Sequence, residues 1–434
     1  MTHVAAAAFT SPLAASLAEG VTERLVRYAK VDTQSDPAFA RKQSPSTARQ
    51  LDLSRLLVDE LLELGLSDVA LDGNGYVTAT LPANAAGAGA PTIGLIAHVD
   101  VSPDAPAEGV EPIVHRVYDG GVIELPRGGT QLDPATTPAL GRKLGHDLVT
   151  SSGDTLLGAD DKAGVAEIMT ALAHLAANPD LPRPTIRVCF TPDEEIGEGA
   201  TLFDIDGFGA YCAYTMDGSE IGELQDETFT AAEVTIDIKG VDIHPGFATG
   251  KMVNAATVCA HIVAALPSDR LTPTTTSGRE GFLHVIQAGG DAASARIWLI
   301  ARDFDDDLLA QHVALARETA LRIGSQWPGA QVTVSDRAQY PNMRAFLEPF
   351  PEVVELAKQA IAAEGIEPVL KEIRGGTDGS VLSARGLPTP NIFTGGHEYH
   401  SVREWASVQD MAAASAVIVH LAGLWAAQEQ PAAG

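Results

Sequence analysis

The sequence predicts a layered α/β fold with a smaller α+β domain inserted into it. Over residues 17–222, short apolar runs typical of buried strands alternate with amphipathic helical segments, which is the pattern of a layered α/β domain. Near residue 227 the pattern changes to apolar–polar alternation, as in half-buried strands. After residue 340 a helix and glycine-rich loops follow. We therefore predict that the second domain interrupts the first.

The first half of the chain supplies most elements of the larger domain. Helical spacing of apolar residues predicts helices at 17–33 and 47–64. A Gly-Asn-Gly turn at 73–75 predicts a hairpin. A helix at 161–179 is stopped by an Asn-Pro pair. Apolar runs with polar ends predict buried strands at 91–101, 185–195 and 210–218.

The inserted domain is predicted from six consecutive elements. In chain order these are a strand at 229–240, a helix at 253–267, strands at 282–290 and 294–305, a helix at 307–328 and a strand at 330–339. This β-α-β-β-α-β order is the split βαβ motif of small α+β domains. A helix at 349–365 then returns the chain to the first domain. We place the domain limits so that 1–222 and 338–434 form one domain and 223–337 the other.

Composition narrows the classes of partner. The chain has 57 acidic and 29 basic residues, a formal net charge of −28, which argues against nucleic acid or an anionic membrane as partner. Three cysteines without a CxxC pair do not form a disulfide framework. The N-terminal segment lacks a basic stretch followed by a sustained apolar run, and we find no uninterrupted apolar stretch of about 18 residues. We expect a soluble cytoplasmic protein with a solvated acidic surface.

The first candidate functional motif is His98-Val99-Asp100, at the end of a predicted strand. Residues two apart on a strand point to the same face, so one side chain can bind a metal while the other orients it. A histidine bound to metal normally gives its second ring proton to a carboxylate or a carbonyl. The alternative is a histidine at a strand end that is merely capped by its neighbour.

The second motif is Asp160-Asp161, at the start of the helix predicted at 161–179. Carboxylates are favourable at a helix N-terminus, so simple capping is one interpretation. The other is a carboxylate that bridges two cations, one oxygen to each, as two metals about 3.5–4 Å apart require.

The adjacent acids Glu194 and Glu195 end another apolar strand and repel each other unless cations compensate. If one binds a metal and the other stays free, the free one can act as a base beside an activated water, whose pKa zinc lowers toward about 7. Asp217 follows a third strand, and His400 lies in a glycine-rich loop. Histidine and carboxylate ligands without thiolate suit zinc, cobalt or manganese, with zinc the default.

These segments resemble, in order, the signatures of a known family. LLGADDKAG, FTPDEEIGEG, KGVDIHPGFATGKMVNA, RDFD, IRGGTDGS and FTGGHEYH are similar to those of the peptidase T branch of the co-catalytic zinc aminopeptidase/carboxypeptidase family. The resemblance covers nearly the whole chain. It implies a cytoplasmic aminotripeptidase, which releases the N-terminal residue of tripeptides, on a layered α/β catalytic domain with an inserted lid or dimerisation domain.

The resemblance also implies roles for individual residues. One zinc would be held by His98 and Asp217 and the other by Glu195 and His400, with Asp160 bridging them. Glu194 would be the general base that serves a metal-bound hydroxide, and Asp100 would orient His98. In this family the peptide bond after the bridging aspartate is often cis.

Four more residues are implied in substrate handling, all in or near the inserted domain. His244 would contact the polarised carbonyl oxygen, often across the interface of a homodimer formed through that domain. Arg374 suits a bidentate grip on a peptide C-terminal carboxylate. Arg302 can do the same, or form a salt bridge with a neighbouring aspartate. Asn254 can bind substrate or cap the following helix.

Two other functions stay open at this point. The same scaffold and chemistry can serve a dipeptidase, a carboxypeptidase or an N-acyl-amino-acid hydrolase. A protein that binds metal but has lost catalysis belongs to another class, and the presence of Glu194 argues against it. The segments IRGGTDGS and TGGHEYH favour peptidase T over the sister activities.

Overall fold

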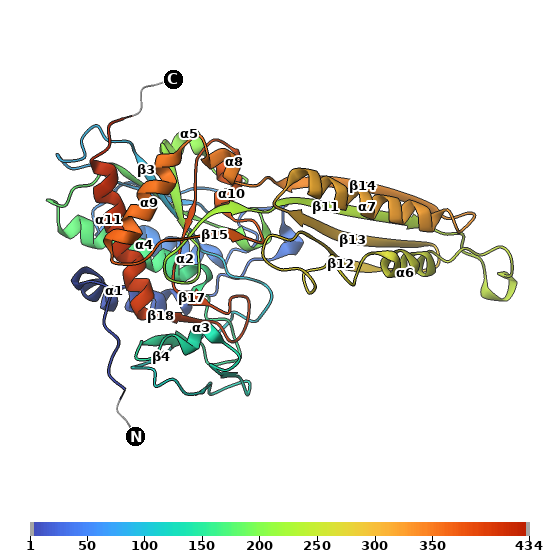
Figure 1. Cartoon of the computed structure of the whole chain (residues 1–434), viewed down its shortest axis with the longest axis horizontal. Coiled ribbons are helices and arrows are strands. Elements are labelled where there is room, and N and C mark those ends of the chain that lie inside the picture. The colour runs from blue at the N-terminus through green and yellow to red at the C-terminus, as the bar shows by residue number, and fades with distance from the viewer. Residues whose placement is uncertain (1–3, 431–434) are drawn as a thin grey trace. The chain divides into compact units, whose positions relative to one another are not determined.

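The computed structural model describes residues 4–430 and contains two compact units. The large unit comprises the chain up to Asp226, Ala345–Lys371 and the residues from Thr377 on. The small unit comprises Glu227–Arg344 and Glu372–Gly376. Figure 1 labels the helices and strands of both units.

The large unit is built around an eight-stranded mixed sheet. In spatial order its strands are β1 (Ser67–Leu71), β2 (Val77–Leu81), β8 (Ile186–Thr191), β3 (Ile93–His98), β9 (Cys212–Met216), β16 (Asn391–Ile392), β10 (Glu223–Thr228) and β15 (Val369–Ile373). The neighbours β8, β3, β9 and β16 run parallel to one another. Their carboxyl ends therefore meet at one edge of the sheet. The hairpin partner β2 joins β8 antiparallel.

Both faces of this sheet are buried. Along β3, Leu95 and Ala97 belong to the main core cluster, whereas Ile96 belongs to a second cluster on the other face. The main core is covered by α1 (Pro12–Ala29), α2 (Gln50–Glu63), α4 (Ala159–Ala177), α9 (Pro351–Ala363) and α11 (Val408–Ala426). The second cluster includes residues of α5 (Ile205–Phe208) and α10 (Asp378–Ala384). The predicted layered α/β architecture is confirmed.

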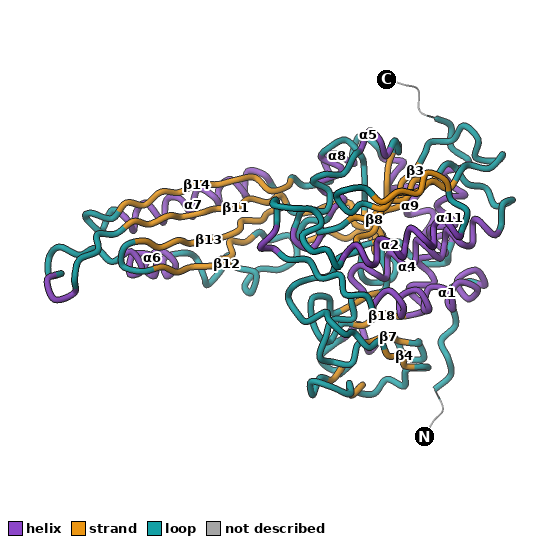
Figure 2. The backbone as a smooth tube through the Cα atoms, turned by 180° about the vertical axis from the view of Figure 1, so that it is seen from behind, coloured by secondary structure: helices purple, strands orange, loops and turns teal. Residues whose placement is uncertain are grey.

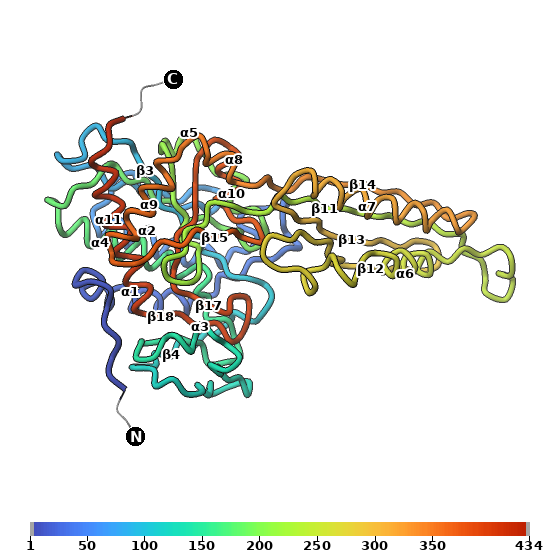
Figure 3. The backbone as a smooth tube through the Cα atoms, in the orientation of Figure 1, coloured from blue at the N-terminus to red at the C-terminus, as the bar shows by residue number. Residues whose placement is uncertain are grey.

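Helix α11 is long and strongly apolar. It has 19 residues, its mean hydropathy is 1.3, and it is the one helix in the described chain that could cross a membrane by length and composition. In the structure 83% of this stretch is buried. It packs against α1, α4 and α9, and Figure 3 shows α1 (blue) and α11 (red) side by side although they lie at opposite ends of the sequence. These contacts make α11 a core helix of the large unit.

Several short elements of the large unit escape sequence prediction. A small antiparallel sheet has the order β17 (Gly396–His397), β18 (Trp405–Ser407), β7 (Leu148–Thr150) and β4 (Ile113–His115). The other short elements are β5 (Ile123–Glu124), β6 (Gln131–Leu132), α3 (Pro138–Gly141), η1 (Pro37–Phe39) and η2 (Glu194–Ile196). Strands of two or three residues carry too little periodicity to be recognised in a sequence.

The small unit contains a four-stranded antiparallel sheet. Its spatial order is β12 (Phe282–Gly290), β13 (Ser294–Asp303), β11 (Thr230–Lys239) and β14 (Gln331–Tyr340). Helices α6 (Ala255–Ala265) and α7 (Asp306–Gly324) pack on it and share its apolar core, and Figure 2 shows them beside the strands. The unit also contains η3 (Pro245–Phe247). Its longer segment ends at Arg344, which is the first residue of α8 (Arg344–Leu347). The predicted β-α-β-β-α-β order is confirmed.

The approach of α4 to the sheet tests how tightly the large unit is packed. A Cβ atom at Gly164 in α4 would overlap the carbonyl oxygen of Met216 and the carboxylate of Asp161. We predict that Gly164→Ala destabilises the protein by about 1–3 kcal/mol, because overpacking against backbone outweighs the gain in helix propensity of about 1 kcal/mol. The midpoint of urea unfolding, at an unchanged slope, measures this effect.

Gly423 in α11 is the matched control, since a Cβ there meets only the carbonyl oxygen of Pro182, at 3.9 Å. Gly423→Ala should therefore stabilise the protein by up to about 1 kcal/mol. Equal shifts for the two variants would show that α4 can move away from β9 without cost.

Candidate active site

Three of the five predicted metal-ligating residues, His98, Glu195 and Asp217, lie at the carboxyl ends of parallel strands in the large sheet. His98 is the last residue of β3, and Asp217 directly follows β9. Glu194 and Glu195 begin the short turn of helix that follows β8. Asp160 lies at the start of α4. The carboxyl edge of an open α/β sheet is where such folds bind their ligands.

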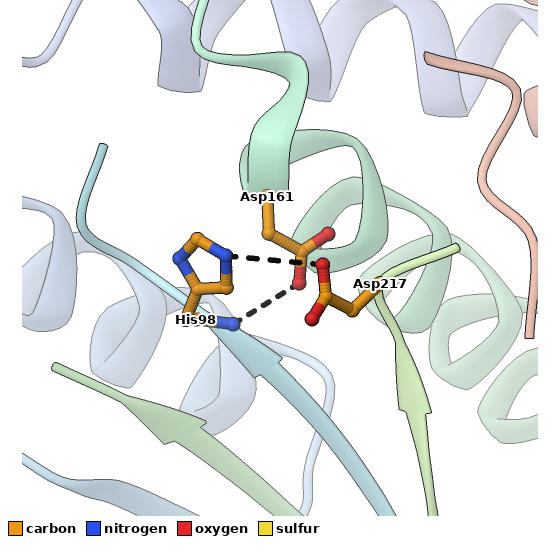
Figure 4. A group of neighbouring side chains, drawn as sticks. All are labelled: His98, Asp161 and Asp217. Carbon is orange, nitrogen blue, oxygen red and sulfur yellow. Dashed lines mark hydrogen bonds and ion pairs between the residues drawn. The ribbon is translucent and has the colours of Figure 1, made fainter. Parts of the chain in front are cut away.

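Figure 4 shows how three of these elements converge. The Nε2 atom of His98 lies 4.0 Å from Oδ1 of Asp217. The backbone N–H of His98 donates to Oδ2 of Asp161 at 3.1 Å, and the N–H of Gly164 donates to Oδ1 at 3.2 Å. Asp161 therefore fastens the end of β3 to the first turn of α4.

Asp160 lies between two imidazoles. Its Oδ1 is 3.0 Å from Nε2 of His98, and its Oδ2 is 3.4 Å from Nε2 of His400. The same nitrogen of His400 is 2.9 Å from Oε2 of Glu195. The peptide bond between Asp160 and Asp161 is cis, as the family resemblance implies. One carboxylate thus faces both halves of the site.

Asp100 is fully buried and connects His98 to the glutamate pair. The Nδ1 atom of His98 is 3.1 Å from the Asp100 carbonyl oxygen and 3.3 Å from Oδ1. The two carboxylate oxygens accept the backbone N–H groups of Glu194 and Glu195 at 3.0 and 3.2 Å. Asp100 therefore orients the imidazole and fixes the backbone from which both glutamates project.

Asp193 precedes this pair with φ of 60°, a left-handed conformation that is uncommon for a residue with a side chain. Its carboxylate accepts hydrogen bonds from the Ser46 N–H at 2.6 Å and from Nε2 of Gln50 at 2.7 Å. These bonds hold the turn that aims the two glutamates into the site.

Glu404 is a supporting residue that sequence reasoning missed. It is buried, and its carboxylate accepts the backbone N–H groups of Leu157, Gly158 and Asp160 at 2.9, 2.7 and 2.9 Å. It therefore fixes the loop that delivers Asp160. The one feature of the sequence that could have indicated Glu404 is its position directly before the apolar strand β18.

Several ionisable side chains of the site have pKa values far from their ordinary ones. Burial raises the pKa of Glu194 and of Asp217 well above their ordinary values, and burial together with the Asp160 charge raises the pKa of Glu195 to about 7. Burial would also raise the pKa of Asp160, but hydrogen bonds from His400 and His98 outweigh it and lower that pKa. Hydrogen bonds that His400 donates to Asp160 and Glu195 raise the pKa of His400 to about 11. Carboxylates that crowd together in this way favour cations between them.

The donor set fits a pair of divalent metal ions. Ligands of a tetrahedral zinc, each about 2.0–2.1 Å from the metal, lie roughly 3.3 Å from one another, and the nitrogen–oxygen distances described above run from 2.9 to 4.0 Å. Ligand atoms of His98, Asp160 and Glu195 lie within 4.8 Å of one another, as do those of His98, Asp161 and Asp217. Oε1 of Glu195 is buried without a hydrogen-bond partner among the described residues. A buried carboxylate oxygen without a hydrogen-bond partner is a suitable donor for a metal ion.

The other predicted residues belong to the small unit. His244 accepts the Gly246 N–H on Nδ1 at 3.1 Å, and its ring lies beside Phe247, which is 70% exposed. Asn254 caps α6 by accepting the Thr257 N–H at 3.1 Å. The capping alternative for Asn254 is thereby observed, and its contact with substrate stays a prediction.

The two predicted carboxylate-binding arginines are both held in place. Arg374 donates through Nη1 and Nη2 to the backbone oxygens of a loop formed by residues 276–280, and its guanidinium lies over the rings of Phe229 and Phe282. Arg302 is 9% exposed, donates to the Ala301 carbonyl at 2.9 Å and lies over the Tyr340 ring. Neither guanidinium is a mobile surface group.

A model of peptidase family M20/M25/M40 matches residues 156–423 of the chain. Curated relatives named Peptidase T match almost all of it. The protein of Aliivibrio salmonicida (strain LFI1238) is 45% identical over 404 residues, which cover 93% of this chain and 98% of the relative. That of Bacillus subtilis (strain 168) is 45% identical over 411 residues, which cover 94% of this chain and 99% of the relative.

Solved structures share the fold of this chain over almost its whole length. Aminopeptidase PepT of Bacillus cereus ATCC 10987 has a TM-score of 0.71 and 25% identity, covering 94% of this chain and 99% of that one. The YXEP protein of Bacillus subtilis, described as a dinuclear metal binding peptidase, shares the fold with a TM-score of 0.62 at 15% identity, covering 94% and 98%. From the matched family model and the full-length relatives, the chain belongs to peptidase family M20/M25/M40, in its peptidase T branch.

Proposed function

We propose that the chain is a two-zinc aminotripeptidase, which hydrolyses the N-terminal peptide bond of tripeptides. The observation that carries the proposal is the position of Asp160 between His98 and His400, with Glu194 and Glu195 on the neighbouring strand end. The relatives called Peptidase T and the neighbour called an aminopeptidase support the reaction class. A tripeptidase from Staphylococcus aureus shares the fold, with a TM-score of 0.74.

Five side chains would hold the metals. His98 and Asp217 would bind one zinc, Glu195 and His400 the other, and Asp160 would serve both. Zinc ions there would supply Lewis acidity for the scissile carbonyl and would acidify a water molecule. Cobalt or manganese would suit the same nitrogen and oxygen donors.

Glu194 is proposed as the general base and proton shuttle. Its Oε2 lies 4.0 Å from Nε2 of His98, and the side chain is 16% exposed, so solvent can reach it. Asp100 fixes its backbone N–H while leaving the carboxylate free to exchange a proton. A buried carboxylate with a raised pKa takes up a proton at neutral pH more readily than an ordinary one.

Substrate contacts are proposed for the small unit. Arg374 and Arg302 offer guanidinium groups to a C-terminal carboxylate, and Asn254 offers an amide. The loop carbonyls that now accept from Arg374 preset its orientation, and a substrate carboxylate would take over some of those donors. Neutral carbonyls are weaker acceptors than a carboxylate, so this exchange is favourable.

We further propose that the small unit is the dimerisation domain of a homodimer and that the enzyme acts in the cytoplasm. The edge strands β12 and β14 leave backbone groups that a two-fold partner can cover. The three cysteines are all free and buried, which suits a reducing compartment. His244, on an exposed loop, would then supply a donor to the developing oxyanion, in its own subunit or in its partner.

The substrate class is tested with a panel of peptides. A free tripeptide should be cleaved, whereas its C-terminal amide and its N-acetylated form should not, and a chelator should abolish hydrolysis. Arg374→Ala should raise KM strongly, since losing a charged contact costs about 2–5 kcal/mol. Arg296→Ala, which removes an exposed arginine of the same unit, should leave KM unchanged. Faster cleavage of dipeptides or N-acyl amino acids would point to a sister activity instead.

The base is tested with Glu194→Gln. We predict that both metals stay bound while kcat falls by about 10²–10⁴-fold, because proton transfer is lost. Glu198→Gln is the control, since Glu198 pairs with Arg41 outside the cluster. Metal analysis of the variant separates the roles: loss of a metal together with activity would make Glu194 a ligand.

The role of His244 is tested by subunit exchange. Inactive Glu194→Gln and His244→Ala proteins are mixed under conditions in which subunits exchange. If His244 acts across the dimer, mixed dimers contain one complete site and activity returns; loss of one oxyanion donor typically costs about 10²–10³-fold in kcat. Full activity of His244→Ala alone would eliminate the catalytic role.

A further inference from the structure

Lys143 is a buried ammonium that has no part in the proposed reaction. Only 4% of its side chain is exposed, and its Nζ lies 2.6 Å from Oε1 of Glu220 and 2.6 Å from Oδ2 of Asp410. It comes from the turn between α3 and β7, a region for which the sequence offered no function. A lysine is rarely buried unless it is paired, and Lys143 is paired twice.

The two carboxylates belong to the segments that carry predicted metal ligands. Glu220 lies three residues after Asp217, in the turn that follows β9. Asp410 lies in the first turn of α11, beyond the loop that carries His400. The ammonium therefore joins both segments to a third part of the chain.

Three hydrogen bonds to backbone carbonyls hold the same two segments together beside the ammonium. The Gly395 N–H donates to the Ser219 carbonyl at 2.7 Å, and the Ser219 hydroxyl donates to the Gly396 carbonyl at 2.8 Å. The Tyr399 hydroxyl donates to the Gly218 carbonyl at 3.0 Å. The segment that carries Glu220 therefore contacts the segment that carries His400 at Gly218 and Tyr399, one residue from Asp217 and one residue from His400.

His397 completes the cluster. Its ring stacks on Trp405 with centroids 4.2 Å apart, and its Nε2 is buried without a hydrogen-bond partner in the described part of the chain. Ligand atoms of Glu220, His397 and Asp410 lie within 4.8 Å of one another, which is the arrangement of a cation site. Burial lowers the pKa of His397 to about 4, so the ring is neutral at pH 7.

The cation of this cluster is already present in the chain. The Lys143 ammonium is within hydrogen-bond distance of both carboxylates, and Arg142 pairs with the outer oxygen of Glu220 from the surface. A metal ion added here would place a second buried cation against the ammonium. The cluster is thus better described as a cation site filled by lysine than as a third metal site.

We propose that Lys143 is a positioning residue of the metal centre: its ammonium holds Glu220 and Asp410 together and thereby keeps Asp217 and His400 at the spacing that two metals need. Without it, the buried carboxylate of Asp410 loses its ammonium and Glu220 keeps only Arg142, and the repulsion between the two carboxylates opens the contact between the two segments. This inference rests on the proposed two-metal function.

Zinc titration of the metal-free protein by calorimetry tests the inference. Lys143→Met should weaken zinc binding by about 10–100-fold, the range found when groups that support metal ligands are removed. Arg142→Met, which removes the exposed partner of the same glutamate, should bind zinc as the wild type does. A Lys143→Met protein that melts earlier but keeps wild-type zinc affinity would refute the positioning role. Failure of the wild type itself to bind two zinc ions would refute the two-metal function instead.

Chemical rescue separates positioning from general stability. Ethylammonium, added to Lys143→Ala, should restore zinc affinity because it can donate N–H groups to both carboxylates, whereas tetramethylammonium should not. Equal effects of the two ions would contradict the proposal. A third zinc in the wild type that disappears in His397→Gln would also contradict it.

If Lys143→Met does not fold, Lys143→Gln, which keeps hydrogen-bond donors but removes the positive charge, is used in its place. Weakened zinc binding by this folded variant would support the inference. Wild-type affinity would overturn it, because the charge of the ammonium would then be dispensable.

Discussion

Repulsion among buried carboxylates is the constraint on which the rest of the large unit depends. Asp160, Glu194, Glu195 and Asp217 gather around two imidazoles at one edge of a sheet, and burial makes their charges costly. The fold accommodates these buried charges because hydrogen bonds hold the backbone segments that carry the side chains. The carboxylates of Asp100, Asp161 and Glu404 each accept backbone N–H groups. These hydrogen bonds fix the backbone of the neighbouring site residues. In the proposed function, divalent cations would balance the negative charge of these carboxylates.

The parallel strands explain why ligands from distant parts of the sequence meet. The strands β8, β3, β9 and β16 are neighbours, so the residues that follow each of them share one edge of the sheet. This is also why the sequence was informative. An apolar run followed by histidine or acid predicts both a buried strand and a candidate site residue at its end, and His98, Glu194 and Asp217 were predicted in this way. The ligand assignments and the cis peptide came from the family resemblance, since spacing alone left helix capping open for Asp160.

Sequence reasoning did not reach residues that act through tertiary contacts. Glu404 and Lys143 have no local pattern, because their partners are backbone groups or acids that lie far away in the chain. Asp161 was noticed only as a helix-start acid, although it ties β3 to α4. Helix α11 escaped prediction because it is buried on all sides and shows no apolar stripe. Strands β11 and β13 and helix α7 of the small unit were recognised because each has a clear period and a half-buried face.

The burial of α11 between α1 and α4 has a consequence for biosynthesis. The core that supports the sheet contains side chains from the first helix of the described chain and from the last. A growing polypeptide exposes the apolar face of α1 until residues 408–426 leave the ribosome, and non-local contacts of this kind form slowly. The large unit therefore cannot complete its core before residue 426 has been synthesised. The proposed site is also completed late, since His400 and Glu404 come shortly before α11 in the chain.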